Sequence, residues 1–243
     1  MTHTAPAKLA DLAAALAQAH RSASCLDADA WAATVQTEAD AYAVHDGVVA
    51  ALGWPATRWK SGGAGPQGPF SHSPVSPVVM APLLGVEAEV ALRLGRDISP
   101  AEARGPLPAG AVDAMCIAVE CVASRWRQGM DAPALLRMAD FQSNAGLLLG
   151  AWQPWRPLDW AQAGWRLALD GQPEITRRGG HSLANPAGVL AAWLQHATRH
   201  GDTVKAGTVV TTGAWGGLHA CPGAAQGTLA IEGLGEFRFS AAA

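Results

Sequence analysis

Two glutamates placed two residues apart inside an apolar run constrain this chain more than any other feature. The run reads Gly85-Val86-Glu87-Ala88-Glu89-Val90-Ala91-Leu92. Side chains alternate between the two faces of a β-strand, so Glu87 and Glu89 would share one face and their apolar neighbours the other. Two carboxylates on an otherwise apolar surface repel each other, and burying either without a counter-charge is costly. A bound cation would remove that cost.

A third carboxylate, Glu120, lies in a second apolar run, Met115-Cys116-Ile117-Ala118-Val119-Glu120-Cys121-Val122. If the two runs are strands of one sheet or of facing sheets, the three glutamates could converge on one point. Three carboxylates make a hard oxygen ligand set that suits Mg²⁺ or Mn²⁺. The lack of a His or Cys ligand pattern argues against zinc. The alternative is a solvated strand face, where alternating polar residues are ordinary.

Four stretches of the chain, in the same order as in a known family, carry a resemblance: Trp59-Lys60-Ser61-Gly62, the acidic run, Ala118 to Arg125, and Leu190 to Leu194 followed by Gly201 and Lys205 to Gly213. They resemble the fumarylacetoacetate hydrolase superfamily. The closest branch is that of 2-oxopent-4-enoate hydratases and 4-oxalocrotonate decarboxylases, which belong to aromatic meta-cleavage pathways. The resemblance extends from about Leu9 to Phe239.

The resemblance implies an α+β fold, a mixed β-roll or β-sandwich of the fumarylacetoacetate hydrolase C-terminal type with an N-terminal helical region. We expect residues 1–55 to form the helical region and residues 56–243 to form the metal-binding catalytic domain. The strands suggested by the sequence are also too numerous and too irregularly spaced for a helix-alternating α/β barrel.

The resemblance also implies a site in which Glu87, Glu89 and Glu120 hold Mg²⁺ or Mn²⁺. Lys60 becomes the best candidate for proton transfer, because a lysine that is partly desolvated near a cation has a lowered pKa. Asp140 is a second catalytic candidate. It could orient substrate or water, although a helix-capping role fits its position at least as well.

The remaining candidates are predicted to contact substrate. Asn144 could orient substrate or water, and Arg125 could pair with a ligand carboxylate, with a substrate carboxylate or with neither. Thr212 and Gly213 end an apolar strand where the family places substrate contacts. His72 lies in a Gly- and Ser-rich segment and could titrate near neutral pH, but no partner pattern singles it out and a surface position fits it better.

Three segments depart from the family pattern: Lys60-Ser61-Gly62-Gly63-Ala64 replaces Lys-Ile-Gly-Leu-Thr, Ala123 replaces an Asp, and Ala139-Asp140-Phe141-Gln142-Ser143-Asn144 replaces an Ala-Asp-Asn-like segment. These departures concern the expected substrate pocket rather than the metal ligands.

The expected function is metal-dependent addition of water to a 2-hydroxy-2,4-dienoate, giving a 4-hydroxy-2-oxo acid. Decarboxylation of a 2-oxo-3-enedioate is the first alternative. Hydrolysis of an acylpyruvate C–C bond, which would need a histidine such as His72 near the metal, is the second. A non-catalytic partner subunit is the third. The family also implies a homo-oligomer, or a complex with a related pathway enzyme.

Composition excludes several other classes of protein. A net charge of −3 with 17 Lys and Arg and no basic cluster offers no footprint for nucleic acid. The apolar stretches are shorter than the roughly 18 to 20 residues of a membrane span. Four cysteines without a C-x-x-C pair and an N-terminus without a secretory core favour a reducing, cytoplasmic location.

Local patterns predict helices first and strands afterwards. Helices are expected over Lys8–His20 and Asp27–Leu52, with Asp27 as the second N-cap. An irregular loop is expected over Gly53–Pro77. A third helix should open at Asn185-Pro186 and run to about His200. Strands are expected over residues 78–93, 111–124, 167–172 with an Asp-Gly turn, 208–212, 228–232 and 235–240.

Overall fold

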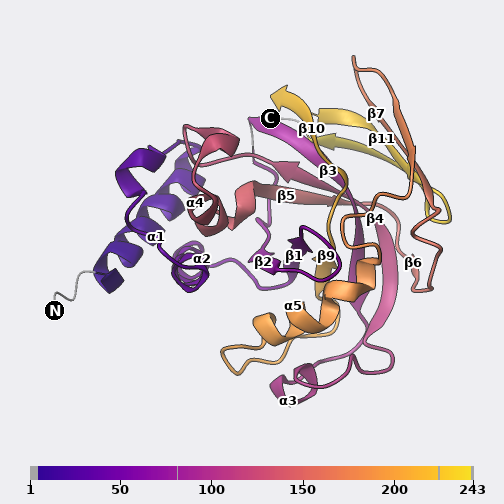
Figure 1. The fold of residues 1–243 in the computed structure, drawn as a ribbon, viewed down its shortest axis with the longest axis horizontal. Helices are drawn as coiled ribbons and strands as arrows, with labels where there is room; N and C mark the ends of the chain where they lie inside the picture. The colour runs from indigo at the N-terminus through magenta and orange to yellow at the C-terminus, as the bar shows by residue number, and fades with distance from the viewer. Residues whose placement is uncertain (1–4, 81, 224, 242–243) are drawn as a thin grey trace.

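Two β-sheets packed face to face form the body of the molecule, and two N-terminal helices lie at one end of it (Figure 1). The structure is a computed structural model that describes residues 5–80, 82–223 and 225–241. This arrangement confirms the expected α+β class with a curled, mixed sheet.

The larger sheet has eight strands, in the order β2-β1-β9-β3-β4-β5, with β10 paired to β3 and β6 paired to β4. Strands β1 and β9 are parallel, and the other pairs are antiparallel. The bounds are β1 Arg58–Gly63, β2 Phe70–Pro74, β3 Leu83–Leu94, β4 Val112–Val122, β5 Asn144–Leu149, β6 Gln153–Pro154, β9 Val209–Thr211 and β10 Trp215–Gly223.

The smaller sheet is antiparallel, with the order β12-β11-β7-β8. Its strands are β7 Gly164–Leu169, β8 Ile175–Arg178, β11 Ala225–Ile231 and β12 Gly235–Ala241. The turn between β7 and β8 contains Asp170 and Gly171, as the sequence predicts, and Gly171 has the positive φ of +76° that this turn requires.

The helices are α1 Ala5–Ser22, α2 Glu38–Leu52, α3 Pro100–Ala103, α4 Ala134–Ala139 and α5 Leu190–Ala197, with 3₁₀ turns η1 Ala28–Trp31, η2 Gly129–Asp131, η3 Phe141–Ser143 and η4 Pro186–Val189. Asn185 caps η4 as expected, since its side chain accepts a hydrogen bond from the Ala187 amide. The first and last predicted helices are therefore confirmed, with the last one beginning as a 3₁₀ turn.

The prediction of one helix over Asp27–Leu52 is wrong. Asp27 caps only the short turn η1. The chain then leaves the helical path, and α2 starts afresh at a capping box in which the Thr37 hydroxyl accepts from the Asp40 amide and the Asp40 carboxylate accepts from the Thr37 amide. A second strong start signal inside the segment divides it into two elements.

The prediction of an irregular loop over Gly53–Pro77 is also wrong, because β1 and β2 form an antiparallel hairpin there. Strand β1 gains a second partner, β9, from far along the chain. Long-range pairing of this kind satisfies the backbone of a Gly-rich segment whose own side chains give little strand signal. Strand β10 was not anticipated at all.

The two faces of β3 and β4 pack against different surroundings. Val86, Ala88 and Val90 pack with residues of the smaller sheet in the main hydrophobic core. The opposite face carries the glutamates and, further along the same two strands, a small apolar cluster that includes Ala91 and Cys116. The alternation of β3 therefore places its glutamates on the face opposite the main core.

A second core lies under the N-terminal helices. Residues of α1 and α2 pack there against Trp126, Leu136 and Phe141 from later in the chain. The division of the chain at residue 55 stays a prediction. Among the residues described, no helix is both long and apolar enough to cross a membrane.

Candidate metal centre and its surroundings

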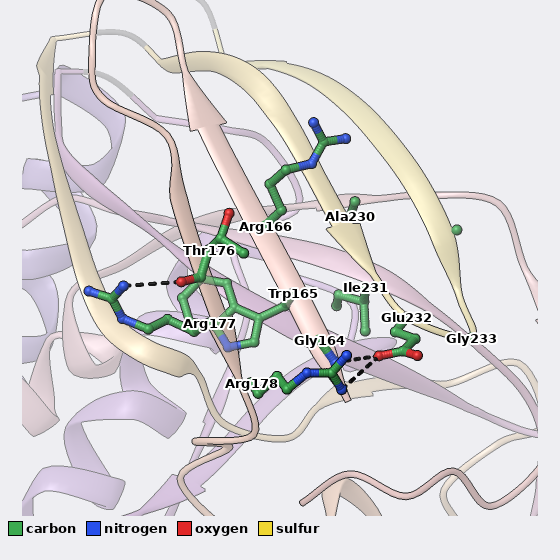
Figure 2. A pocket seen from close by; sticks show the side chains of 11 residues that line it. Gly164, Trp165, Arg166, Thr176, Arg177, Arg178, Ala230, Ile231, Glu232 and Gly233 are labelled. Atoms are coloured by element: carbon green, nitrogen blue, oxygen red, sulfur yellow. Dashed lines mark hydrogen bonds and ion pairs between the residues drawn. The ribbon is translucent and has the colours of Figure 1, made fainter. Parts of the chain in front are cut away.

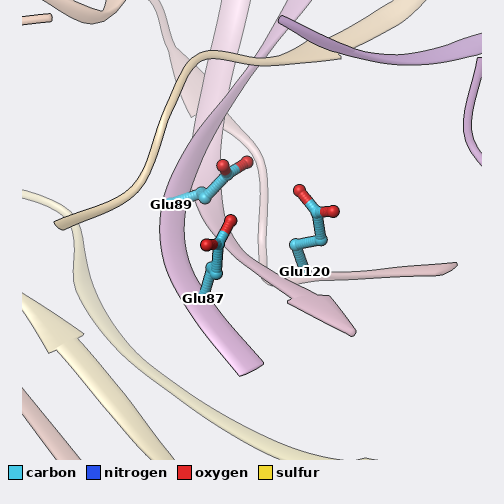
Figure 3. Close-up of side chains that lie close together, drawn as sticks. All are labelled: Glu87, Glu89 and Glu120. Carbon is cyan, nitrogen blue, oxygen red and sulfur yellow. The ribbon is translucent and has the colours of Figure 1, made fainter. Parts of the chain in front are cut away.

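Glu87, Glu89 and Glu120 come together as the sequence predicts (Figure 3). Strands β3 and β4 pair with Glu87 directly opposite Glu120, so these two side chains share a face. Glu89 follows on the same face, opposite Ala118. One carboxylate oxygen from each of the three glutamates lies within 4.8 Å of the other two.

Two of the three glutamates are buried, Glu87 is partly exposed, and the carboxylates repel one another. Glu89 is 2% exposed and Glu120 is fully buried. Burial, followed by repulsion from Glu120 and Glu87, raises the pKa of Glu89 well above its usual range. Burial also raises the pKa of Glu120, although Lys60 opposes that shift. The protein therefore holds several carboxylates where a counter-charge is needed.

The donor set fits a hard divalent cation. Oε2 of Glu89 and Oε2 of Glu120 are buried without a hydrogen-bond partner among the described residues. Buried polar atoms are nearly always paired, so these two oxygens are free to coordinate a bound cation. Three carboxylates and one ammonium leave a formal charge of about −2, which a divalent ion would balance.

Lys60 and Asn144 complete the immediate surroundings of Glu120. Lys60 Nζ lies 2.5 Å from Glu120 Oε1, and Asn144 Nδ2 donates to the same oxygen at 3.1 Å. Burial lowers the pKa of Lys60, but the carboxylates of Glu120, Glu87 and Glu89 raise it by more, so the net pKa is above its usual value. A bound cation would act in the opposite direction.

The sequence analysis did not identify two hydroxyl groups that lie beside Lys60, those of Ser73 and Thr211. Lys60 pairs with Ser73 of β2 and with Thr211 of β9, so all three side chains point to the glutamate side of the sheet. Both hydroxyl oxygens are buried and make no hydrogen bond of ordinary geometry with any described residue. Thr211 lies near enough to Glu89 to favour its ionised form. Ser73, Lys60 and Thr211 thus form one row across three strands, the Lys60 row, and only the pairing register of those strands places them side by side.

Arg125 and Asp140 pair with each other instead of facing the glutamates separately. Arg125 Nε donates to Asp140 Oδ1 at 2.5 Å, and the Arg125 amide donates to Asp140 Oδ2 at 2.9 Å. Both side chains are buried. The pair joins the end of α4 to the segment after β4, so both oxygens of the proposed catalytic carboxylate are already engaged.

His72 lies on the far face of the β1–β2 hairpin. Its Nδ1 is 2.7 Å from Ser61 Oγ, and Ser61 points away from Lys60 because the two are adjacent on the strand. Burial, followed by the charge of Arg199, lowers the pKa of His72 to about 4. The structure therefore does not bring His72 to the glutamates, which removes the support for a His-assisted hydrolase.

Thr212 and Gly213 follow β9 at the edge of the site. The Thr212 hydroxyl is buried and donates to the Val90 carbonyl at 3.3 Å, which commits it to the backbone. Gly213 has a φ of +96°, and a Cβ on Gly62 would lie 3.9 Å from its Cα. A Cβ at Gly62 would therefore be in ordinary van der Waals contact with Gly213, and it is the parallel pairing of β1 with β9 that holds the hairpin at this edge.

Another hollow lies on the smaller sheet (Figure 2). It has a volume of about 420 Å³ and is lined by β7, β8 and the end of β11. Its arginines are largely paired: Arg178 with Glu232 at 3.3 Å, and Arg166 with Glu236 at 2.8 Å. The hollow contains none of the buried, unpaired acids that mark the glutamate site.

The sheet architecture agrees with a family comparison. Residues 60–239 match the family model described as fumarylacetoacetate (FAA) hydrolase C-terminal. The chain belongs to this family.

Individual relatives narrow the branch. The chain is 36% identical over 158 residues to a 2-keto-4-pentenoate hydratase of Paraburkholderia phymatum, and 27% identical over 161 residues to a 4-oxalocrotonate decarboxylase of a Pseudomonas species. Each match covers 64% of this chain and 59% of the relative, so the matched region spans about three fifths of the relatives' length.

Solved structures share the fold over nearly the whole chain. A 4-oxalocrotonate decarboxylase from Pseudomonas putida G7, complexed with magnesium and adipate, superimposes with a TM-score of 0.76 at 16% identity, covering 96% of this chain and 97% of that one. The same enzyme complexed with calcium and acetate gives a TM-score of 0.74 at 18% identity.

Proposed function

We propose that this protein is a divalent-metal-dependent hydratase of a short 2-hydroxy-2,4-dienoate, producing a 4-hydroxy-2-oxo acid. The observation that carries the proposal is the cluster of three glutamates, two of them buried, with two unpaired oxygens and an ammonium group 2.5 Å from Glu120. The hydratase names among the relatives support it. So does the magnesium held by the decarboxylase of similar fold.

Glu87, Glu89 and Glu120 would hold the ion, with Mg²⁺ or Mn²⁺ as the candidates. When bound, it would stabilise negative charge on the 2-oxygen of the substrate. Lys60 holds a proton at Nζ and delivers it to C5 of the dienol, while the 2-hydroxyl group gives up its proton, which returns to Nζ; the product is an electrophilic 2-oxo-3-enoate. Water then adds its oxygen at C4 and a proton at C3. Asn144 fixes the Glu120 carboxylate through its amide.

Decarboxylation of a 2-oxo-3-enedioate is the second candidate, because a relative and a structure of similar fold carry that name. It would use the same ion and the same dienolate, with CO₂ leaving in place of water adding. A metal-binding but inactive partner subunit is the third. A homo-oligomer, or a complex with a related enzyme, is part of the proposal and is tested by the mass of the purified protein in solution.

The decisive experiment follows the ultraviolet absorbance of 2-hydroxypenta-2,4-dienoate and of 2-oxohex-3-enedioate with Mg²⁺, Mn²⁺ or excess chelator. We expect metal-dependent loss of the dienoate signal. Glu89→Gln should abolish it, and Lys60→Ala should slow it by about 10²- to 10⁴-fold through loss of proton transfer.

Glu236→Gln is the matched control, since Glu236 is exposed on the smaller sheet, and it should leave the rate unchanged. CO₂ release from the diacid alone would replace the hydratase by the decarboxylase. Metal binding without turnover of either compound by the wild type would indicate the inactive partner.

A further inference from the structure

A second cavity lies on the glutamate side of the β1–β2 hairpin. It has a volume of about 280 Å³ and is lined by Ser71, Gln142, Ser143 and Arg137, with Met130 and Met138 among its apolar walls. Ser71 shares a face with Ser73, which pairs with Lys60. Since two residues of a strand span about 7 Å, the cavity begins roughly that far from the Lys60 row.

The opposite wall of this cavity, formed by Gln142 and Ser143, is next in sequence to a residue that contacts the glutamate cluster. Ser143 directly precedes Asn144, whose amide donates to Glu120. Phe141, Gln142 and Ser143 have φ values of 52°, 55° and 61°, three consecutive residues in the left-handed region. Such residues cost about 1–2 kcal/mol each outside glycine. The strained turn keeps Gln142 and Ser143 beside the cavity while Asp140 stays bound to Arg125.

Arg137 is the charged residue of this cavity, and no acid lines it among the residues described. Its Nε is buried without a hydrogen-bond partner, and none of the ion pairs found in the described ranges includes it. Ser143 is 1% exposed and its hydroxyl is likewise unpaired. A cation and a hydroxyl left without partners at one cavity form a receptor for an anion.

We infer that Arg137 binds a second carboxylate at the distal end of the substrate, so that the chain acts on a diacid. The inference rests on the proposed function, since it assumes that the glutamate centre holds the 2-oxo acid end. The ion pair also favours a carboxylate that is retained. A guanidinium stabilises a carboxylate but not neutral CO₂, and so raises the barrier to losing that group. A dienedioate undergoing hydration fits better than one undergoing decarboxylation.

The test compares two six-carbon substrates that differ only at the far end, 2-hydroxyhexa-2,4-dienedioate and 2-hydroxyhexa-2,4-dienoate. The wild type should prefer the diacid by about 10- to 100-fold in kcat/KM, as expected for one charge-assisted hydrogen-bonded pair at a half-buried arginine. Arg137→Met should remove that preference by lowering kcat/KM for the diacid much more than for the monoacid, and Arg137→Lys should restore part of it. Arg127→Met, at an arginine on the surface, is the matched control.

Two outcomes would overturn the inference. Equal loss on both substrates in Arg137→Met would place the guanidinium on the shared 1-carboxylate. Stoichiometric CO₂ from the diacid would show that the distal carboxylate is not retained.

A binding measurement separates this inference from the proposed function. Titration calorimetry of the Mg²⁺-loaded protein should show adipate binding about 10-fold or more tightly than hexanoate, and Arg137→Met should abolish the difference. If neither dienoate is turned over but this difference is found, the proposed function fails and the anion site stands. If the two acids bind equally, the anion site fails whatever the turnover.

Discussion

At the scale of single residues, one substitution separates the two roles open to Asp140. Its carboxylate binds the side chain and the amide of Arg125 in a fully buried setting. Asp140→Asn would leave the guanidinium without a counter-charge, and breaking one side of a buried pair costs about 3–5 kcal/mol. We expect a loss of that size in the free energy of unfolding measured with urea.

Asp113→Asn serves as the comparison, because Asp113 pairs with Arg93 at a half-exposed position. It should cost at most about 1 kcal/mol. A variant Asp140→Asn with wild-type stability and no turnover would instead make Asp140 a catalytic group.

At the scale of elements, the position of Glu87 depends on how closely β10 approaches β3. Gly85 pairs with Ala220, and a Cβ at Gly85 would collide with the His219 carbonyl and lie 2.8 Å from Leu218 Cδ1. Gly85→Ala should therefore push the strands apart. We expect a destabilisation of about 1–3 kcal/mol, measured by thermal and urea unfolding, together with weaker Mn²⁺ binding, since Glu87 lies two residues away.

Gly188→Ala is the control, because a Cβ there meets no atom within 4 Å. It should keep both stability and metal affinity. Unchanged Mn²⁺ affinity in Gly85→Ala would mean that Glu87 is positioned by β4 alone.

At the scale of the whole molecule, buried neutral histidines should make stability depend on pH. Burial is the largest cause of a pKa near 4 for His45 and for His181. An unfolded chain binds these protons near pH 6.5 and the folded chain only near pH 4, so the unfolding free energy falls as the pH drops between these values. The slope is about 1.4 kcal/mol per pH unit for each such imidazole.

His45 is the best probe, because it is fully buried and bonds the Met138 carbonyl, away from the glutamates. His45→Gln should flatten the urea-derived stability profile between pH 6.5 and 4 by up to about that slope. An identical slope in wild type and variant would contradict the assignment. The raised pKa of Glu89 acts in the opposite sense, so the comparison uses the difference between the two proteins.

Element boundaries divided into those that were predictable and those that were not. The Asp-Gly turn and the Asn185 cap were predictable, because each depends on the conformation of a few neighbouring residues. The hairpin β1–β2 was not, because its Gly-rich residues give little strand signal and β1 also pairs with β9, about 150 positions further on. A local window also could not tell that Thr37 restarts a helix that Asp27 had begun.

The sequence by itself determined the chemistry available on β3, since a period of two places Glu87 and Glu89 on one face wherever the strand lies. Only the tertiary structure decided what meets them. The β3–β4 register puts Glu120 opposite Glu87, and the hairpin brings Lys60 to Glu120 while turning His72 away. Alternation along a strand is a local property of the backbone. Register and strand order depend on which distant segments bury their apolar faces together, and that is a property of the whole chain.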